Sequence, residues 1–394
     1  MSVSAAGPDL PTEDDVLGLL RGVVDPELGL DIVELGMAKG ARIDPDGVVH
    51  VAVALTTSGC PLRAQIQRDV RARVGSLPGV TRVRMDWSEL SAEEKATAMA
   101  RARRHIAERT EQTAVPSRTK VVMVASGKGG VGKSSVTVNL AAALAASGLT
   151  VGVLDADIWG FSVPRMLGLD GRLEAEGTPP RIRPQELAVG DGLLRVVSMG
   201  FLVDDEESAL MWRGLILNRA VQHFLEDVDW GDLDYLLIDM PPGTGDVQMG
   251  LARMLPRSEM IVVTTPSLNA QKVAVRVVDM GRKNYLRIVG IVENMSVYVD
   301  DTGRDHHIFG RGGGRALAEA CGVELLGVIP IEPEVAHGGD HGAPAALGDG
   351  PAAAAFSALA RVVTEAIPVA ELEGCTARML AAVDEALAAA EAAG

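Results

Sequence analysis

The chain has 394 residues and carries 37 lysines and arginines against 53 aspartates and glutamates, which gives a formal net charge of −16. This length predicts two or three domains whose cores need no disulfide or metal staples. The acidic balance and an aromatic content of 3% argue against a nucleic-acid partner, because phosphates are repelled and bases find few stacking platforms.

The cysteines, Cys60, Cys321 and Cys375, form no Cys-x-x-Cys pair, so the sequence encodes no legible disulfide framework or cysteine-only zinc site. The opening residues, MSVSAAGPDLPTEDD, lack the apolar segment of a signal peptide, and no apolar stretch reaches membrane-spanning length. We therefore expect a cytoplasmic protein without a membrane partner.

Residues 9–87 predict a small α+β domain. Thr12 precedes three acidic residues and suits a helix N-cap, and Asp44-Pro45-Asp46-Gly47 is a turn sequence. The apolar pattern predicts helices over Asp9–Arg21 and Pro61–Gly75 and strands over Glu34–Ile43, Val48–Leu55 and Val80–Trp87.

Residues 88–117 are a charged stretch that predicts a solvated linker helix, ended by Pro116. The alternative for its arginine cluster is a local nucleic-acid patch, made of Arg101, Arg103, Arg104 and Arg109. Residues 368–394 are rich in alanine and predict a C-terminal helix, which lacks the basic face of a membrane-targeting helix.

Residues 118–367 alternate short apolar runs with helical patterns such as Gly132–Ser147 and Ala270–Arg282. Val/Ile/Leu-rich strands that alternate with helices predict an α/β domain with a mostly parallel sheet and helices on both faces. The predicted strands are Lys120–Ala125, Thr150–Asp155, Tyr235–Asp239, Met260–Thr264, Arg287–Glu293 and Glu324–Ile329.

The strongest motif is GKGGVGKS at residues 127–134, which fits G-x-x-x-x-G-K-[ST] between an apolar strand and an apolar helix. In such a loop, glycines let successive backbone N–H groups converge on phosphate oxygens, and the following helix directs its positive end at them. Lys133 supplies a charge for the β- and γ-phosphates, and the Ser134 hydroxyl suits Mg²⁺. We expect the nucleotide to contact Gly127, Lys128, Gly129, Gly130, Val131, Gly132, Lys133, Ser134 and Ser135.

Acidic residues follow two of the predicted strands. Asp239 ends its strand and is expected at the carboxyl edge of the sheet, where it could hold Mg²⁺. Asp155 and Asp157 reach the same edge, and either could orient the attacking water, helix capping being the alternative. Gly243, in PPGTGD, could bring a backbone N–H group to the γ-phosphate.

The string KGGVGKS resembles the deviant Walker A loop of the dimerising MinD/ParA-type ATPases, and DADIWGFSVP, IDMPPGTGD, VENMS and IFGRGGG resemble the Mrp family of iron–sulfur cluster carriers. In the first domain, VVDPELGLDIVELGMAKG and LTTSGCPL are similar to the small cysteine-bearing domain fused to bacterial Mrp proteins. The resemblance covers about residues 12–87 and 119–367.

This resemblance implies a P-loop NTPase that binds ATP with Mg²⁺ and works as a homodimer. It implies that Lys128 reaches across the dimer to the partner's nucleotide, that Asn294 hydrogen-bonds the adenine and that Asp157 activates water. It further implies an iron–sulfur cluster as cargo, with apoprotein clients and Fe–S assembly factors as partners.

The sequence departs from the family at one position, because the usual Cys-x-x-Cys after ENMS would fall near Asp300 and Gly303. His306 and His307 could ligate iron, but adjacent side chains of a strand point apart, and we favour a solvated loop. Cys60 is then the best thiol ligand, since it directly precedes a predicted helix, a place where thiolates form readily; a buried structural cysteine is the alternative.

Cys321 occurs in an apolar helical context and predicts core packing, and Cys375 receives no role. We predict an ATP-hydrolysing iron–sulfur cluster carrier. The alternatives are an ATP-dependent regulatory or scaffold protein of the same family that has lost cluster binding, or a MinD/ParA-like positioning ATPase.

Overall fold

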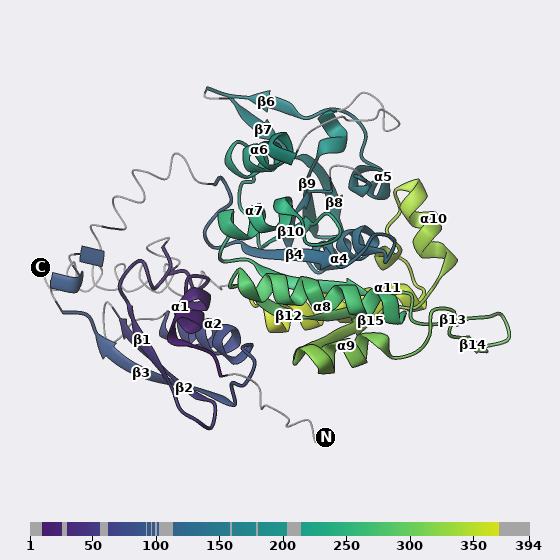
Figure 1. Cartoon of the computed structure of the whole chain (residues 1–394). Coiled ribbons are helices and arrows are strands. Elements are labelled where there is room, and N and C mark those ends of the chain that lie inside the picture. Colours follow the sequence, from purple (N-terminus) through teal and green to yellow (C-terminus); the bar gives the residue numbers. More distant parts are fainter. Residues whose placement is uncertain are drawn as a thin grey trace, which may run out of the picture.

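The computed structural model describes residues 10–25, 30–55, 62–91, 93–95, 97–98, 101, 113–157, 160–178, 180–202 and 214–369. They form a small N-terminal unit, purple in Figure 1, beside a larger α/β unit.

The small unit is a three-stranded sheet covered by two helices. Its elements are α1 (Glu13–Leu20), β1 (Ala38–Ile43), β2 (Val48–Leu55), α2 (Arg63–Gly75) and β3 (Arg82–Glu89). The strand order is β1-β2-β3, with β1 antiparallel and β3 parallel to β2. Side chains from the sheet and both helices, among them Val16, Val51 and Val70, form a separate hydrophobic core.

The predicted elements of this unit are present; β2 has the predicted bounds, and the bounds of the others are shifted. Thr12 caps α1 as expected, in a capping box with Asp15, so the helix begins at Glu13 rather than Asp9. The strand predicted from Glu34 begins only at Ala38, because the Asp31 carboxylate accepts hydrogen bonds from the amides of Val33 and Glu34 and holds a turn there.

The larger unit is built on an eight-stranded sheet with the order β15-β12-β11-β4-β10-β5-β9-β8, in which β8 alone is antiparallel to its neighbour. The strands are β4 (Lys120–Ser126), β5 (Thr150–Asp155), β8 (Gln185–Val189), β9 (Gly192–Ser198), β10 (Tyr235–Asp239), β11 (Glu259–Thr264), β12 (Arg287–Glu293) and β15 (Glu324–Val328). Two short hairpins, β6 (Glu174–Glu176) with β7 (Arg181–Arg183) and β13 (Tyr298–Val299) with β14 (Asp305–His306), stand outside it.

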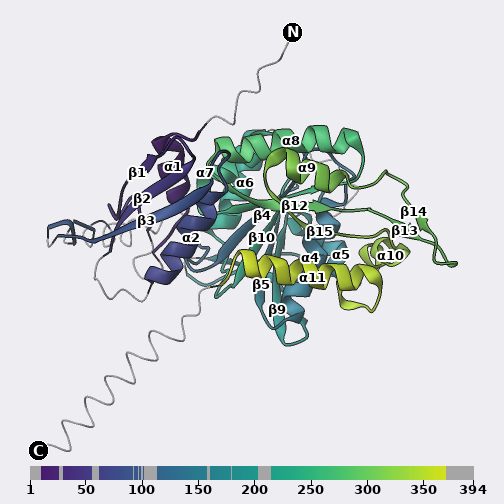
Figure 2. The same cartoon turned by 90° about the horizontal axis from the view of Figure 1, so that it is seen from below.

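Helices cover both faces of this sheet, as Figure 2 shows from below. Along β4, Val121, Met123 and Ala125 point into one hydrophobic core, and Val122 and Val124 point into the other, as period-two alternation requires. The first core is closed by α6 (Gly214–Glu226), α7 (Asp246–Met254), α8 (Leu268–Lys283) and α9 (Gly313–Cys321), and the second by α4 (Lys133–Ala146), α5 (Val163–Leu167) and α11 (Pro351–Ala366). The remaining helices are α10 (Pro333–His341) and the short 3-10 turns η2 (Met199–Leu202) and η3 (Ala345–Leu347).

The predicted α/β class and all six predicted strands of this unit are confirmed, with ends that differ by at most one residue. Strands β8 and β9 are not among the predicted strands. They form a hairpin closed by Gly190-Asp191, where Gly190 has a φ of +58° that favours glycine.

The small unit contacts the edge of the large sheet at which the parallel strands begin, which we call the amino edge. Arg73, from α2, is 4% exposed there, and its Nη2 donates to the Arg257 carbonyl (2.7 Å) and lies 3.4 Å from Glu259. Beside it, the Tyr285 ring packs so closely on Gly18 that a Cβ at Gly18 would lie 2.2 Å from the ring.

The predicted linker is helical at its described residues 93–95, 97–98 and 101, although β3 continues into it as far as Glu89. The predicted helix over 368–394 lies outside the described residues apart from 368 and 369, which are not helical.

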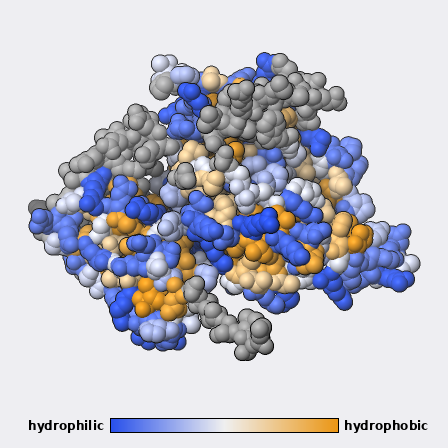
Figure 3. Space-filling model, viewed as in Figure 1, coloured by the Kyte–Doolittle hydropathy of each residue, from blue (hydrophilic) through white to orange (hydrophobic). Residues whose placement is uncertain are grey.

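Apolar side chains gather over the face of α8 and α9 in Figure 3, and Val275 of α8 is 43% exposed. None of the helices in the described part of the chain is both long and apolar enough to cross a membrane.

Candidate functional site

The predicted phosphate loop joins the end of β4 to the start of α4. Gly130 and Gly132 have φ values of +77° and +78°, a conformation that glycine adopts without strain. Gly127 is required for another reason, since a Cβ there would lie 2.6 Å from the backbone of Val273 and Ala274 in α8. The loop can therefore curl around a ligand at the N-terminus of α4, where the helix dipole favours an anion.

Lys133 and Ser134, the first residues of α4, meet the carboxylate of Asp239 at the end of β10. Asp239 is fully buried, and its Oδ2 accepts a 2.6 Å hydrogen bond from the Ser134 hydroxyl. Lys133 Nζ lies 2.8 Å from Asp239 Oδ1, and the Thr137 hydroxyl donates to the same oxygen at 2.8 Å. A buried carboxylate with a cation and two hydroxyl donors is electrostatically satisfied.

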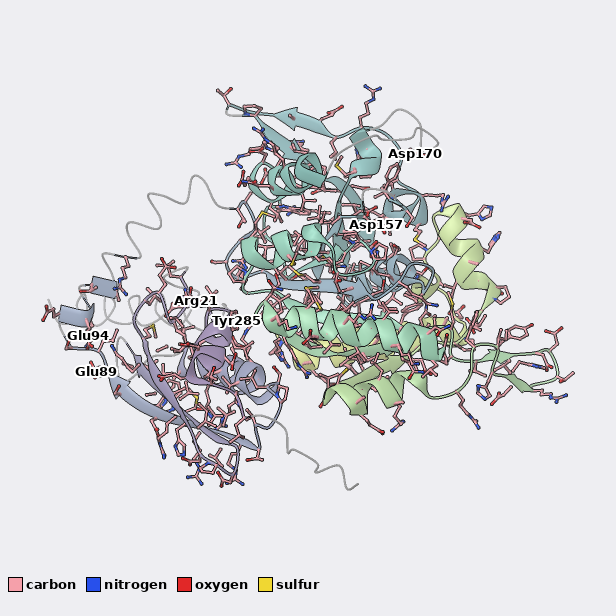
Figure 4. The ribbon with its side chains drawn as sticks, viewed as in Figure 1. Arg21, Glu89, Glu94, Asp157, Asp170 and Tyr285 are labelled. Atoms are coloured by element: carbon pink, nitrogen blue, oxygen red, sulfur yellow. The ribbon has the colours of Figure 1, made fainter. Side chains whose placement is uncertain are left out.

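Asp157, labelled in Figure 4, lies on the loop after β5, with its Oδ2 3.7 Å from Lys133 Nζ. Burial raises the pKa of Asp157, and the charge of Lys133 opposes that rise. A carboxylate with a raised pKa next to the lysine of a predicted phosphate loop is suited to accept or orient a proton of water.

Asp155 is 1% exposed and has a different set of partners. Its carboxylate accepts from the Ser198 hydroxyl at 3.0 Å and from the amides of Asp157 and Ser162, both at 3.2 Å. Burial, and next the charge of Asp239, raises the pKa of Asp155 to about 7. Asp155 therefore ties the loop after β5 to the neighbouring strand β9.

The register of the sheet explains why these groups meet. Asp239 pairs with Val124 on one side and with Asp155 on the other, and Asp155 pairs with Ser198. All four residues therefore lie in one row across the carboxyl edge, the edge opposite the small unit. Ligands of open α/β sheets bind at this edge.

A cavity of about 230 Å³ opens beside the phosphate loop, at the same edge of the sheet. Its lining contains the predicted loop residues Lys128, Gly129, Gly130, Gly132, Lys133, Ser134 and Ser135, together with Asp157 and Pro242. Lys128 is exposed and Val131 is buried.

Two more predicted residues lie at the loop. Gly243, with a φ of +95°, donates its amide to the Ser126 carbonyl at 2.9 Å, next to the start of the phosphate loop. Asn294 is 4% exposed, and its side-chain amide donates to the Val131 carbonyl at 2.9 Å. The predicted contacts with the γ-phosphate and the adenine stay predictions.

The donor set fits Mg²⁺ and a nucleotide. The Ser134 hydroxyl and the Asp239 carboxylate are hard oxygen donors, the type that Mg²⁺ prefers, and they lie 2.6 Å apart. Bound there, the ion would shield the charge of the phosphates.

The predicted cluster ligands fall in different places. Cys60 and Cys375 lie outside the described residues, whereas Cys321 is 8% exposed in the first core, as expected, and burial raises the pKa of its thiol. Asp300 and Gly303 lie in the β13–β14 hairpin, where His306 Nε2 is 2.7 Å from Asp300 Oδ2. Hydrogen bonds from Thr302, and next from His306, lower the pKa of Asp300.

Sequence reasoning missed Thr137 and Ser198. Thr137 follows Ser134 by three residues on α4, so helical spacing alone could have placed both hydroxyls toward Asp239. Ser198 could not be found without β9, because its role depends on the register with Asp155.

Two family models match the chain. Residues 117–365 match the ParA model, described as NUBPL iron-transfer P-loop NTPase, and residues 13–85 match the model of the iron–sulfur cluster assembly protein. The first match spans more than half of the chain.

Curated relatives carry the name iron–sulfur cluster carrier protein. The one from Deinococcus radiodurans is 45% identical over 362 residues, which are 91% of this chain and 97% of that protein. The one from Mycobacterium tuberculosis is 44% identical over 335 residues, covering 83% and 86%. A solved nucleotide-binding protein from Archaeoglobus fulgidus in complex with ADP is 34% identical, with a TM-score of 0.48 over 57% of this chain and 86% of that one. With a model match over most of its length and relatives of this identity, the chain belongs to the ParA family of NUBPL iron-transfer P-loop NTPases.

Proposed function

We propose that the chain is a Mg²⁺-dependent ATPase that carries iron–sulfur clusters to apoproteins. The observation that carries this proposal is the meeting of Lys133, Ser134 and Asp157 at one cavity beside a phosphate loop. Buried Asp239 contacts both Lys133 and Ser134 from behind that cavity. The cargo is proposed from the relatives, which are named iron–sulfur cluster carrier proteins and of whose length this chain covers 86% or more.

Each site residue has a role in the hydrolysis that we propose. The loop amides and Lys133 bind the β- and γ-phosphates, while Ser134 and Asp239 hold Mg²⁺. Asp157 orients the attacking water, and Asp155 fixes the loop that carries Asp157; the hydrogen bonds that Asp155 accepts from this loop and from Ser198 support this choice between the two. Gly243 senses the γ-phosphate, and Asn294 contacts the adenine.

A homodimer that forms at the carboxyl edge is supported by what is exposed there. Lys128 is an exposed cation on the rim of the cavity. Three large apolar side chains are also exposed on segments that follow this edge: Leu268 by 63%, Ile308 by 61% and Phe309 by 45%. Exposed apolar side chains beside a charged site are typical of an association surface.

We propose a separate role for each of the predicted domains. Residues 118–367 hydrolyse ATP, and residues 9–87 bind the cluster through Cys60, with 88–117 as linker and 368–394 as a terminal helix. Clients and Fe–S assembly factors meet the chain in the cytoplasm.

The dimer and the hydrolysis are tested by mixing two inactive variants. Lys128→Ala and Asp157→Ala should each lose hydrolysis while still binding ATP, as measured by phosphate release and equilibrium binding. A mixture should regain activity, because one composite site of the heterodimer has both groups. Absence of rescue at every mixing ratio, with heterodimers demonstrated, contradicts the action of Lys128 across the dimer.

A second function, an ATP-dependent scaffold without cargo, is favoured by one observation, the non-cysteine residues Asp300 and Gly303 at the family's usual cysteine positions. Iron–sulfur clusters require thiolates and most take four, whereas each subunit supplies one Cys60. A cluster held there needs ligands from a client, an assembly factor or a small thiol.

Anaerobic reconstitution with iron and sulfide separates the two functions. The carrier should bind iron, lose it in Cys60→Ala and keep it in the matched control Cys321→Ala, while ATP hydrolysis is unchanged in Cys60→Ala. Iron content and transfer to an apoferredoxin are the measurements. No bound iron in the wild type establishes the scaffold instead, and unchanged iron in Cys60→Ala refutes the assignment of Cys60.

A further inference from the structure

Two histidines lie one helical turn apart on α10, at the end of the molecule remote from the small unit (Figures 1 and 2). His337 and His341 are both exposed, and their ring centroids are 4.1 Å apart with an interplanar angle of 33°. The spacing i, i+4 on one helix face is the one with which paired histidines chelate a metal ion. Neither residue belongs to the nucleotide site or to the predicted cluster ligands.

A hydrogen bond fixes the tautomer of one ring. His341 Nδ1 lies 2.8 Å from the His337 carbonyl oxygen. Because a carbonyl oxygen only accepts, Nδ1 carries the proton, and the lone pair of the neutral ring is on Nε2. Metal-binding histidines are oriented by this kind of bond from their second nitrogen to a backbone carbonyl.

The surroundings of the pair favour a cation. Gly338 and Gly339, which separate His337 from Asp340, place no side chain beside the rings; Gly338 is buried, and Gly339 faces Met166 of α5. The helix ends at His341, so its negative dipole end lies beside that ring. The helix sequence, PEVAHGGDH, contains no lysine or arginine.

From this geometry we propose that His337 and His341 chelate a divalent transition-metal ion of the imidazole-preferring class, Ni²⁺, Cu²⁺ or Zn²⁺. In the described part of the chain, no group of three or more histidine, cysteine, aspartate or glutamate side chains is arranged around a metal position. The two imidazoles thus leave the other coordination positions to water or to an incoming ligand, which is the arrangement of an exchangeable site rather than of a closed structural one.

Calorimetric titration of the full chain, without an affinity tag, with Ni²⁺ tests the site. The wild type should bind one equivalent more than the double variant His337→Asn/His341→Asn. Each single variant should weaken this binding step at least about tenfold, because a chelate needs both rings. Ni²⁺ should also raise the melting temperature of the wild type and not that of the double variant, since an ion that binds only the folded helix stabilises it.

His223→Asn is the matched control. His223 is also an exposed helical histidine, but its partner four residues on is Asp227, 2.7 Å from Nδ1. This variant should bind Ni²⁺ as the wild type does. Equal stoichiometry and affinity in the wild type and the double variant overturn the proposal, as does loss of binding in only one of the two single variants. We expect the circular dichroism spectrum and ATP binding to be unchanged in all variants. Unchanged values exclude loss of folding as the cause of weaker Ni²⁺ binding.

Discussion

Asp155 shows how one buried carboxylate can shape a site from outside the cavity that it supports. Its oxygens accept from Ser198 on one side and from backbone amides of the loop after β5 on the other. Burial and the nearby charge of Asp239 make its ionised form costly, although Lys133 offsets part of this cost.

This environment predicts a pH dependence of folding. The folded pKa of Asp155, about 7, lies above the ordinary value of 3.8, so between these values the folded chain binds more protons than the unfolded one. The stabilising contribution of protonated Asp155 is therefore complete below about pH 4 and is lost as the pH rises to about 7. The free energy of unfolding of the wild type and of Asp155→Asn should be measured in urea between pH 5 and 8. As the pH rises, the wild type should lose stability relative to Asp155→Asn. Parallel pH profiles for the two proteins contradict the assignment.

At the scale of elements, the phosphate loop depends on its packing against α8 as well as on its own glycines. Gly127 lies against the α8 backbone, whereas nothing lies within 4 Å of a Cβ built at Gly129. Glycines of one motif therefore serve different purposes, and the motif alone does not separate them.

We expect Gly127→Ala to destabilise the chain by about 1–3 kcal/mol, because a methyl group there must displace helix backbone. Gly129→Ala is the control with free space and should unfold at nearly the wild-type urea concentration. ATP binding should weaken in Gly127→Ala, as the shifted loop misplaces its amides. Equal unfolding midpoints for the two variants would show that α8 moves to accommodate the methyl group at little cost in stability.

The sequence predicts the strands of the large sheet well because each buried strand is a continuous apolar run, such as Leu236–Ile238, between turn residues. The phosphate loop was predicted from its motif, and Asp239 from its position at a strand end. By contrast, β8 alternates polar and apolar residues on a half-exposed edge and is joined to β9 by a two-residue turn, a weaker local signal. The role of Asp155 required its neighbours on β9 and β10, which depend on strand order and not on local pattern.

At the scale of the whole molecule, the two units are joined by buried charge. Arg73 approaches Glu259, which Arg287 also contacts at 2.8 Å, and burial lowers the pKa of Arg73. A Cβ at Gly22 would lie 2.2 Å from Arg73 Nη1, so the guanidinium is enclosed by both units. Tyr285, labelled in Figure 4, lies at the same junction, where its ring packs on Gly18.

Removing one partner of a buried ion pair is costly, so Arg73→Met should lower the free energy of unfolding by about 3 kcal/mol in urea titrations of the full chain. Limited proteolysis should also cut between the units faster, because the junction loses a buried contact. Arg71→Met, a change to an exposed arginine of the same helix, should remain within about 0.5 kcal/mol of the wild type. Equal behaviour of the two variants would show that the junction does not depend on Arg73.

The small unit and the nucleotide cavity occupy opposite edges of one sheet, which fixes the layout of the dimer that we propose. Two copies that meet at their carboxyl edges carry their small units at the far poles. A seven-residue strand spans about 23 Å at roughly 3.3 Å per residue, so the poles stand at least about 45 Å apart. A single iron–sulfur cluster cannot span the distance between the two small units. Each small unit must therefore bind its own partner. One dimer can therefore serve two clients at once, and a client can leave without the dimer coming apart.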